Sequence, residues 1–149
     1  MARLTSLPAN VFIVMDNTTF RSSVVSQEEY QAQNAWGLLA SLNLYGCERT
    51  KITDLNIIRD FLQKLCAAID MKPHGEPLMG KFGEGSLEGY SALQFIETSS
   101  ITVHFDDKGD NRAFIDIFSC QYFDAEKARA FCQNYLNASR SEVRSLLRK

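Results

Sequence analysis

Three strand-like segments in succession constrain the fold of this chain more than any other feature. Residues 90–97, 100–105 and 113–120 are rich in β-branched, aromatic and other apolar side chains, and the polar stretch 106–111 separates the last two. Short segments of this kind joined by polar turns are typical of antiparallel hairpins. We therefore predict an antiparallel sheet at the centre of the fold.

Helical periodicity adds a second kind of element. Apolar side chains recur at helical spacing over residues 54–69, with Thr53 or Asp54 as the N-cap. Asp124 is predicted to begin another helix that runs to Leu136. Residues 36–47 are predicted to form a strand that Gly46 ends.

The order of these elements is strand, helix, extended segment, three strands, helix. This order predicts an α+β fold, an antiparallel sheet with helices on one face. Because one helix layer leaves the other sheet face open, and Tyr, Phe and Leu side chains lie in the strands, we expect that face to pack on a second copy.

The two ends of the chain give weaker patterns. Residues 1–34 are interpreted as an N-terminal arm with a strand-like piece at 11–15 and a short helix within 27–34, followed by the main domain at 35–149. Residues 139–149 are expected to form a short basic helix or a solvated end.

Composition excludes several classes of protein. A chain of 149 residues fits one domain plus an arm, and a net charge of −2 with a pI near 5.7 argues against nucleic acid as the main partner. No apolar run approaches the ~20 residues that cross a bilayer, and we find no secretory signal, so a cytoplasmic location is expected.

The four cysteines include no C-x-x-C pair, which disfavours a zinc site. Cys66 and Cys132 are expected to be buried.

Polar groups gather around the stretch "ETSSITVHF", residues 97–105. In the simplest hairpin register His104 lies opposite Phe114 and Thr102 opposite Asp116, so one face carries hydroxyl, imidazole, carboxylate and the Cys120 thiol. Residue types alone leave three readings open, namely a Ser-His-Asp hydrolase, a Cys-His nucleophile pair and a purely structural cluster. No G-x-S-x-G elbow supports the first.

The spacing of these residues is more specific than their types. Ser91, then Ser99, then His104, then "FIDIFSC" ending in Cys120, with "LNLYGC" before the long helix, resembles the small prokaryotic S-adenosylmethionine decarboxylase proenzymes. The resemblance covers about residues 36–131. It implies an αββα sandwich formed by a homodimer, with a small-molecule substrate and neither metal nor nucleic acid.

The resemblance also implies a role for each matched residue. The chain would cut itself between Thr98 and Ser99, and Ser99 would become a covalent pyruvoyl group that forms a Schiff base with the substrate amine. Ser91 and His104 match the processing residues, and Cys120 matches the thiol that protonates the product carbon. The implied function is pyruvoyl-dependent decarboxylation of S-adenosylmethionine for spermidine synthesis.

Two departures from the family pattern affect the substrate side. Asn43 stands where members usually carry an acid, and "HFDDKGDN" replaces the usual segment after the histidine. The alternatives are therefore a pyruvoyl-dependent arginine or ornithine decarboxylase and an uncleaved partner or regulatory homologue. Trp36, Phe82 and Tyr90 are expected to be packing residues rather than nucleobase platforms.

Overall fold

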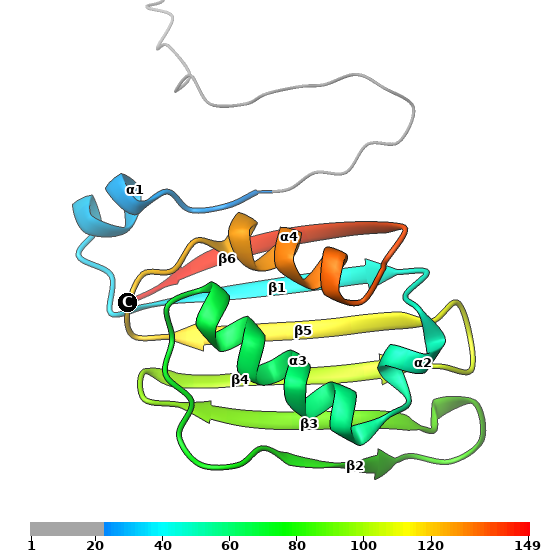
Figure 1. Ribbon diagram of the computed structural model, residues 1–149. Helices are drawn as coiled ribbons and strands as arrows, with labels where there is room; N and C mark the ends of the chain where they lie inside the picture. The colour runs from blue at the N-terminus through cyan, green and yellow to red at the C-terminus, as the bar shows by residue number, and fades with distance from the viewer. Residues whose placement is uncertain (1–22) are drawn as a thin grey trace, which may run out of the picture.

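The predicted sheet is present and has six strands, all antiparallel, in the order β2-β3-β4-β5-β1-β6 (Figure 1). The computed structural model describes residues 23–149. The strands are β1 Gly37–Tyr45, β2 Leu78–Phe82, β3 Gly89–Ile96, β4 Ser99–Asp106, β5 Arg112–Ser119 and β6 Arg140–Arg148. The helices are α1 Gln27–Ala32, α2 Arg49–Ile52, α3 Leu55–Ala68 and α4 Ala125–Tyr135, with a 3₁₀ turn at Gly85–Leu87.

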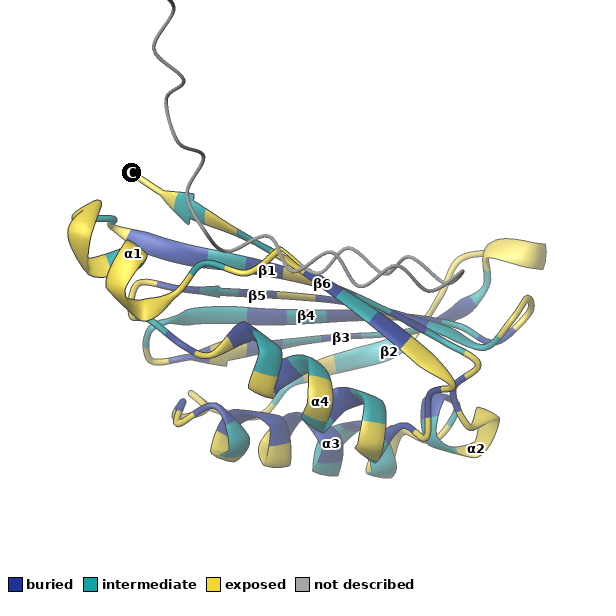
Figure 2. Ribbon diagram, turned by 90° about the horizontal axis from the view of Figure 1, so that it is seen from above, coloured by how far each residue is buried: buried dark blue, intermediate teal, exposed yellow. Residues whose placement is uncertain are grey.

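The two longest helices cover one face of the sheet, as predicted (Figure 2). Asp54 accepts hydrogen bonds from the backbone of Asn56 and Ile57, which confirms it as the N-cap of α3. Asp124 does the same for α4. The buried stripe of α3 faces the sheet and consists of Ile58, Phe61, Leu62, Leu65 and Cys66. Cys132 on α4 is also fully buried, so both cysteine predictions are confirmed.

The hairpin register is confirmed residue by residue. His104 lies opposite Phe114 and Thr102 opposite Asp116. Alternate side chains of β4, such as Ile101 and Val103, point into the core under the helices and are fully buried. Their neighbours Thr102 and His104 therefore belong to the other sheet face, which no helix among residues 23–149 covers and which we call the open face.

The C-terminal segment is a strand, so the expectation of a basic helix or a solvated end is wrong. Strand β6 pairs with β1 along its whole length. Val143 is buried under α4, while the charged side chains of Arg140, Glu142 and Arg144 alternate onto the open face. In the sequence of this strand, charged residues alternate with uncharged ones, and the apolar residues do not show a clear alternation. Only one face of the strand contacts the core.

The N-terminal segment approaches the outer edge of β6. Ser23 forms a bridge to Arg144, and α1 follows at the same end of the sheet as the C-terminus (Figure 1). The short helix expected within 27–34 is confirmed. The strand-like piece at 11–15 lies outside the described residues. Along residues 23–149 no helix is long and apolar enough to span a membrane.

Candidate active site

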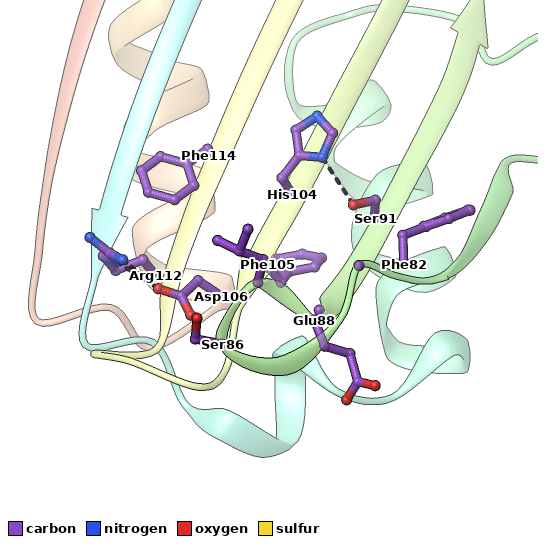
Figure 3. A pocket seen from close by; sticks show the side chains of 12 residues that line it. Phe82, Ser86, Glu88, Ser91, His104, Phe105, Asp106, Arg112 and Phe114 are labelled. Atoms are coloured by element: carbon purple, nitrogen blue, oxygen red, sulfur yellow. Dashed lines mark hydrogen bonds and ion pairs between the residues drawn. The ribbon is translucent and has the colours of Figure 1, made fainter.

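One group of candidate residues lies where β3 and β4 meet on the open face. Ser91 and His104 are direct cross-strand partners, and the Ser91 Oγ lies 2.9 Å from His104 Nδ1 (Figure 3). They border a hollow of about 300 Å³ that Phe82 and Phe114 also line. The hydrogen bond fixes the orientation of the imidazole ring, so a proton-transfer group stands beside a hollow of ligand size.

An ion pair closes one side of this hollow. Arg112 Nε donates to Asp106 Oδ2 over 2.9 Å. The hydrogen bond from Arg112 holds the pKa of Asp106 below its usual range, and backbone donors from Gly109 and Lys108 add to this effect. Asp106 is therefore an ionised structural partner of Arg112 rather than a proton donor.

A second group lies at the tight turn between β3 and β4. Ile96 pairs with Ser99, so Glu97 and Thr98 alone form the turn. Ser99 has a φ of 150°, a backbone conformation that side-chain-bearing residues rarely adopt and that stores strain. The residue that follows the Thr98–Ser99 peptide bond is thus held in an unfavourable backbone conformation at the exit of the turn.

Neighbouring groups hold the Thr98 end of this peptide in place. The backbone N–H of Cys120 donates to the Thr98 carbonyl oxygen over 2.9 Å. The fully buried Ser119 hydroxyl donates to Thr98 Oγ1 over 2.9 Å, and Thr98 Oγ1 lies 3.2 Å from Met71 Sδ. Sequence reasoning missed Ser119 and Met71, because their contacts with Thr98 join segments far apart in the chain and no local pattern marks them.

The two groups do not form one cluster. Ser99 and His104 stand five positions apart on β4, which at about 3.3 Å per residue separates them by roughly 16 Å. The predicted shared face for His104, Asp116 and Cys120 fits the pairing, but Asp116 binds Ser41 at 2.5 Å and Cys120 lies beyond the far end of β5. The expectation that all these groups converge in a small area is wrong within one chain.

Cys120 is the exposed member of the four cysteines. It borders a wider hollow of about 580 Å³ together with Asn34, Ala35, Trp36 and Lys149. Trp36, predicted to be a packing residue, stacks on Phe118 with ring centroids 5.9 Å apart, yet 63% of its surface is exposed. Tyr90 packs against the core as predicted, whereas Phe82 is 60% exposed, so the packing prediction for Phe82 is wrong.

Glu142 is a candidate that the sequence reasoning missed. It lies opposite Asn43 on β6 and accepts hydrogen bonds from Asn43 Nδ2 at 3.0 Å and Tyr45 Oη at 2.9 Å. The hydrogen bond from Asn43 is the main cause of a lowered pKa at Glu142, and the bond from Tyr45 adds to it. A carboxylate thus stands one strand away from the position where the family pattern places an acid. The charge alternation of residues 140–144 was the available signal.

The open-face positions that pair with Ser91 and His104 form one row across the sheet. Besides these two, the row contains Gly80, Phe114, Asn43 and Glu142. Within residues 23–149 no group of three or more His, Cys, Asp or Glu side chains is arranged to hold a metal ion.

Comparisons with known proteins identify a family and agree with this fold. The model of the S-adenosylmethionine decarboxylase family matches residues 39–149. An S-adenosylmethionine decarboxylase proenzyme of Clostridium botulinum strain Langeland is 30% identical over 109 residues, 72% of this chain and 89% of that protein. The protein of strain Loch Maree with the same description is 28% identical over the same span.

A solved structure shows the same fold. The crystal structure of the adenosylmethionine decarboxylase from Aquifex aeolicus aligns with a TM-score of 0.63 at 21% identity, covering 76% of this chain and 91% of that chain. The chain belongs to the S-adenosylmethionine decarboxylase family, a family of decarboxylase enzymes. The predicted family and α+β fold are confirmed.

Proposed function

We propose that the protein is a pyruvoyl-dependent S-adenosylmethionine decarboxylase that forms its prosthetic group by autocatalytic serinolysis at Ser99, and that it serves spermidine synthesis. The observation that carries this proposal is the geometry of the Thr98–Ser99 peptide. A serine at a strained φ of 150° follows a carbonyl that is already hydrogen-bonded by the Cys120 N–H. Both features favour reaction at this peptide bond.

The first step is an N-to-O acyl shift. Ser99 Oγ attacks the carbonyl carbon of Thr98, the new C–O bond replaces the C–N bond, and the Ser99 nitrogen takes up a proton. Negative charge develops on the Thr98 oxygen during this attack, and the Cys120 N–H at 2.9 Å is placed to stabilise it. Leaving the strained φ at Ser99 also lowers the barrier.

The second step is β-elimination. A base removes the Cα proton of residue 99, the ester C–O bond breaks, and Thr98 leaves as a carboxylate. Water then replaces the nitrogen of residue 99, which departs as ammonia, and a pyruvoyl group blocks the new chain of residues 99–149. The pyruvoyl group needs no separate binding site, because it forms from the atoms of Ser99.

The base comes from a second copy of the chain. By family resemblance His104 is the processing base, yet it lies roughly 16 Å from Ser99 along β4. Packing two open faces about a two-fold axis that crosses the strands brings the His104 end of one copy to the Ser99 end of the other. Exposed apolar side chains on this face, including Phe95 and Leu146, favour such packing.

The remaining residues act during turnover. When present, the pyruvoyl carbonyl supplies the electron sink for loss of CO₂. Cys120, exposed and next to the cut site, delivers the proton to the product carbon. Ser91 orients His104 through its 2.9 Å hydrogen bond.

The hollow beside His104 favours a substrate with a flat ring. Phe82 and Phe114 present aromatic surface there, which suits stacking of an adenine. The alternative of arginine or ornithine is favoured by the carboxylate of Glu142 in the same row, since a basic side chain needs an acid. Release of CO₂ from labelled S-adenosylmethionine, arginine and ornithine separates the two, and we expect S-adenosylmethionine alone to react.

Intact mass under denaturing conditions tests the cut itself. We expect two fragments, 1–98 and a pyruvoyl-blocked 99–149, from the native sequence and from the matched control Ser100→Ala. Ser99→Ala should stay at full length and release no CO₂. An uncut native chain would refute both decarboxylase proposals and support the reading as a non-catalytic partner.

A further inference from the structure

The N-terminal segment that precedes the family match reaches the Cys120 end of the sheet. The family model begins at residue 39, whereas α1 and residues 34–36 lie before it. Tyr30 of α1 donates its hydroxyl proton to the backbone carbonyl of Cys120 over 3.2 Å. Residues 34–36 border the hollow into which Cys120 is exposed.

Cys120 is held from two sides by its own peptide groups. Its N–H donates to the Thr98 carbonyl, and its C=O accepts from Tyr30. Cys120 follows the last residue of β5, so the sheet ladder no longer fixes it. These two hydrogen bonds therefore set the direction in which the thiol points.

Packing anchors the Tyr30 side of this arrangement. The rings of Tyr30 and Tyr122 contact each other with centroids 5.7 Å apart, and Val25 packs against the core. Val25 N–H donates to Ser145 Oγ over 2.7 Å, and Ser26 caps α1. The short helix is thus fixed at both the edge of β6 and the loop after β5.

The cut between residues 98 and 99 affects these two hydrogen bonds differently. The Thr98 carbonyl becomes the carboxylate of a new chain end, which frays more readily than a strand turn. The Tyr30 bond does not involve the cut peptide. We propose that Tyr30 is a positioning residue, which aims the Cys120 thiol at the substrate carbon after the cut, so that the N-terminal segment is part of the active site. This inference rests on the proposed function.

Aim matters because the proton has two possible destinations. Delivered to the substrate carbon, it lets water release the decarboxylated amine and restore the carbonyl of residue 99, so the enzyme is left unchanged. Delivered instead to the carbon of residue 99, it leaves the substrate nitrogen on the chain as the amino group of a terminal alanine, while water supplies the oxygen of the released aldehyde. Loss of the correct orientation of the Cys120 thiol therefore leads to inactivation of the enzyme.

Tyr30→Phe tests the hydroxyl while keeping the ring, and Tyr122→Phe is the matched control because it removes a hydroxyl from the same aromatic pair. The measurement is the number of amine products released for each fragment that acquires a free alanine amino terminus. We expect Tyr30→Phe to lower this ratio about fivefold, the typical effect of one neutral hydrogen bond, with an unchanged rate of cutting. A purely structural role would slow cutting or unfold the protein without moving the ratio.

A second measurement does not depend on turnover. In the uncut Ser99→Ala chain, alkylation by iodoacetamide reports the accessibility of Cys120, because the other three cysteines are buried. We expect Tyr30→Phe to raise the alkylation rate by roughly threefold to tenfold, as the loop loosens, and Tyr122→Phe to leave it unchanged.

The outcomes separate the two proposals. If the native chain cuts and turns over but Tyr30→Phe matches the control in both measurements, this inference falls and the proposed function stands. Equal effects of both variants would mean that the hydrogen bond from Tyr30 to Cys120 has no specific role, and they would overturn the inference as well. If the native chain neither cuts nor releases CO₂, the function fails first, and the role of Tyr30 in turnover fails with it.

Discussion

The two ends of β4 carry different chemistry on one strand. At the Ser99 end, the Cys120 N–H donates to the Thr98 carbonyl oxygen and the Ser119 hydroxyl donates to the Thr98 side chain. At the His104 end, an oriented imidazole stands beside a hollow with aromatic walls. On the proposed function, each end depends on the other, because the bond to be cut lies at the Ser99 end and the processing histidine lies at the His104 end.

This division shows why residues that match a family in sequence need not meet within one chain. A strand of eight residues keeps its two ends apart, and in the proposed dimer a second sheet that is turned end for end joins them. The experiments below test the division, beginning with the largest expected effect.

Mixing two inactive chains gives the strongest test. Ser99→Ala and His104→Ala, each expressed alone with its own tag, should remain uncut. Expressed together, they should form mixed dimers in which Ser99 of the His104→Ala chain meets His104 of the Ser99→Ala chain, so the His104→Ala chain should be cut. Fragment masses read by tag check this. If pairing with a Ser99→Ala/His104→Ala double variant restores cutting equally well, the composite site is excluded.

Cys120→Ala should separate cutting from turnover. The backbone N–H at residue 120 remains, so we expect the Thr98–Ser99 bond to be cut at close to the native rate. Loss of the thiol should slow productive turnover by about 10²-fold or more, the range of general acid catalysis, and raise the share of fragments that begin with alanine. Fragment mass and CO₂ release measure the two properties. Native turnover by Cys120→Ala would remove the thiol from the mechanism.

Thr98→Val should weaken the Ser99 end specifically. The substitution keeps the shape but removes the hydroxyl that Ser119 and Met71 contact, which costs about 1 kcal/mol in the free energy of unfolding. Urea unfolding of the uncut Ser99→Ala chain measures this without interference from cutting. Thr102→Val, at mid-strand on the open face, is the control and should change stability by less than about 0.5 kcal/mol.

Substitution of Glu142 should give the smallest effect, a weak change in how stability depends on pH. Glu142 lies in the same row of open-face residues as His104. Hydrogen bonds from Asn43 and Tyr45 depress its pKa in the folded state. Its contribution to stability is therefore present above the unfolded pKa of about 4.3 and is lost as the pH falls through the lower folded pKa.

The comparison uses Glu142→Gln in the uncut chain. Between pH 7 and acid, the native chain should lose up to ~0.5 kcal/mol more stability than the glutamine variant, because solvent partly screens a group that is only partly buried. Equal losses in the two chains would mean that Asn43 and Tyr45 do not favour the ionised form.

The central hairpin and the helices were predictable because short-range patterns encode them. Asp54 and Asp124 mark helix starts, and the alternation around Ile101 and Val103 fixes the register. Strand β6 was missed because Val143 is the apolar residue near its middle that contacts the core. One such residue does not produce a recognisable apolar periodicity.

The site was predictable only in part. The spacing of Ser91, Ser99, His104 and Cys120 located both ends of β4, but the distance between the ends depends on strand geometry, which spacing along the chain does not express. The hydrogen bond from Tyr30 to Cys120 joins residues 90 positions apart, and no local pattern marks such a contact.

The strand order has a consequence for assembly. With a cut between residues 98 and 99, β1, β2 and β3 belong to one fragment and β4, β5 and β6 to the other, yet β1 lies between β5 and β6. The fragments are interleaved, so neither can leave without opening ladders on both sides of β1. Once unfolded, they would have to find each other by diffusion, and refolding would become concentration-dependent. Folding must therefore precede the cut, and a cut protein that unfolds loses its one-chain route back.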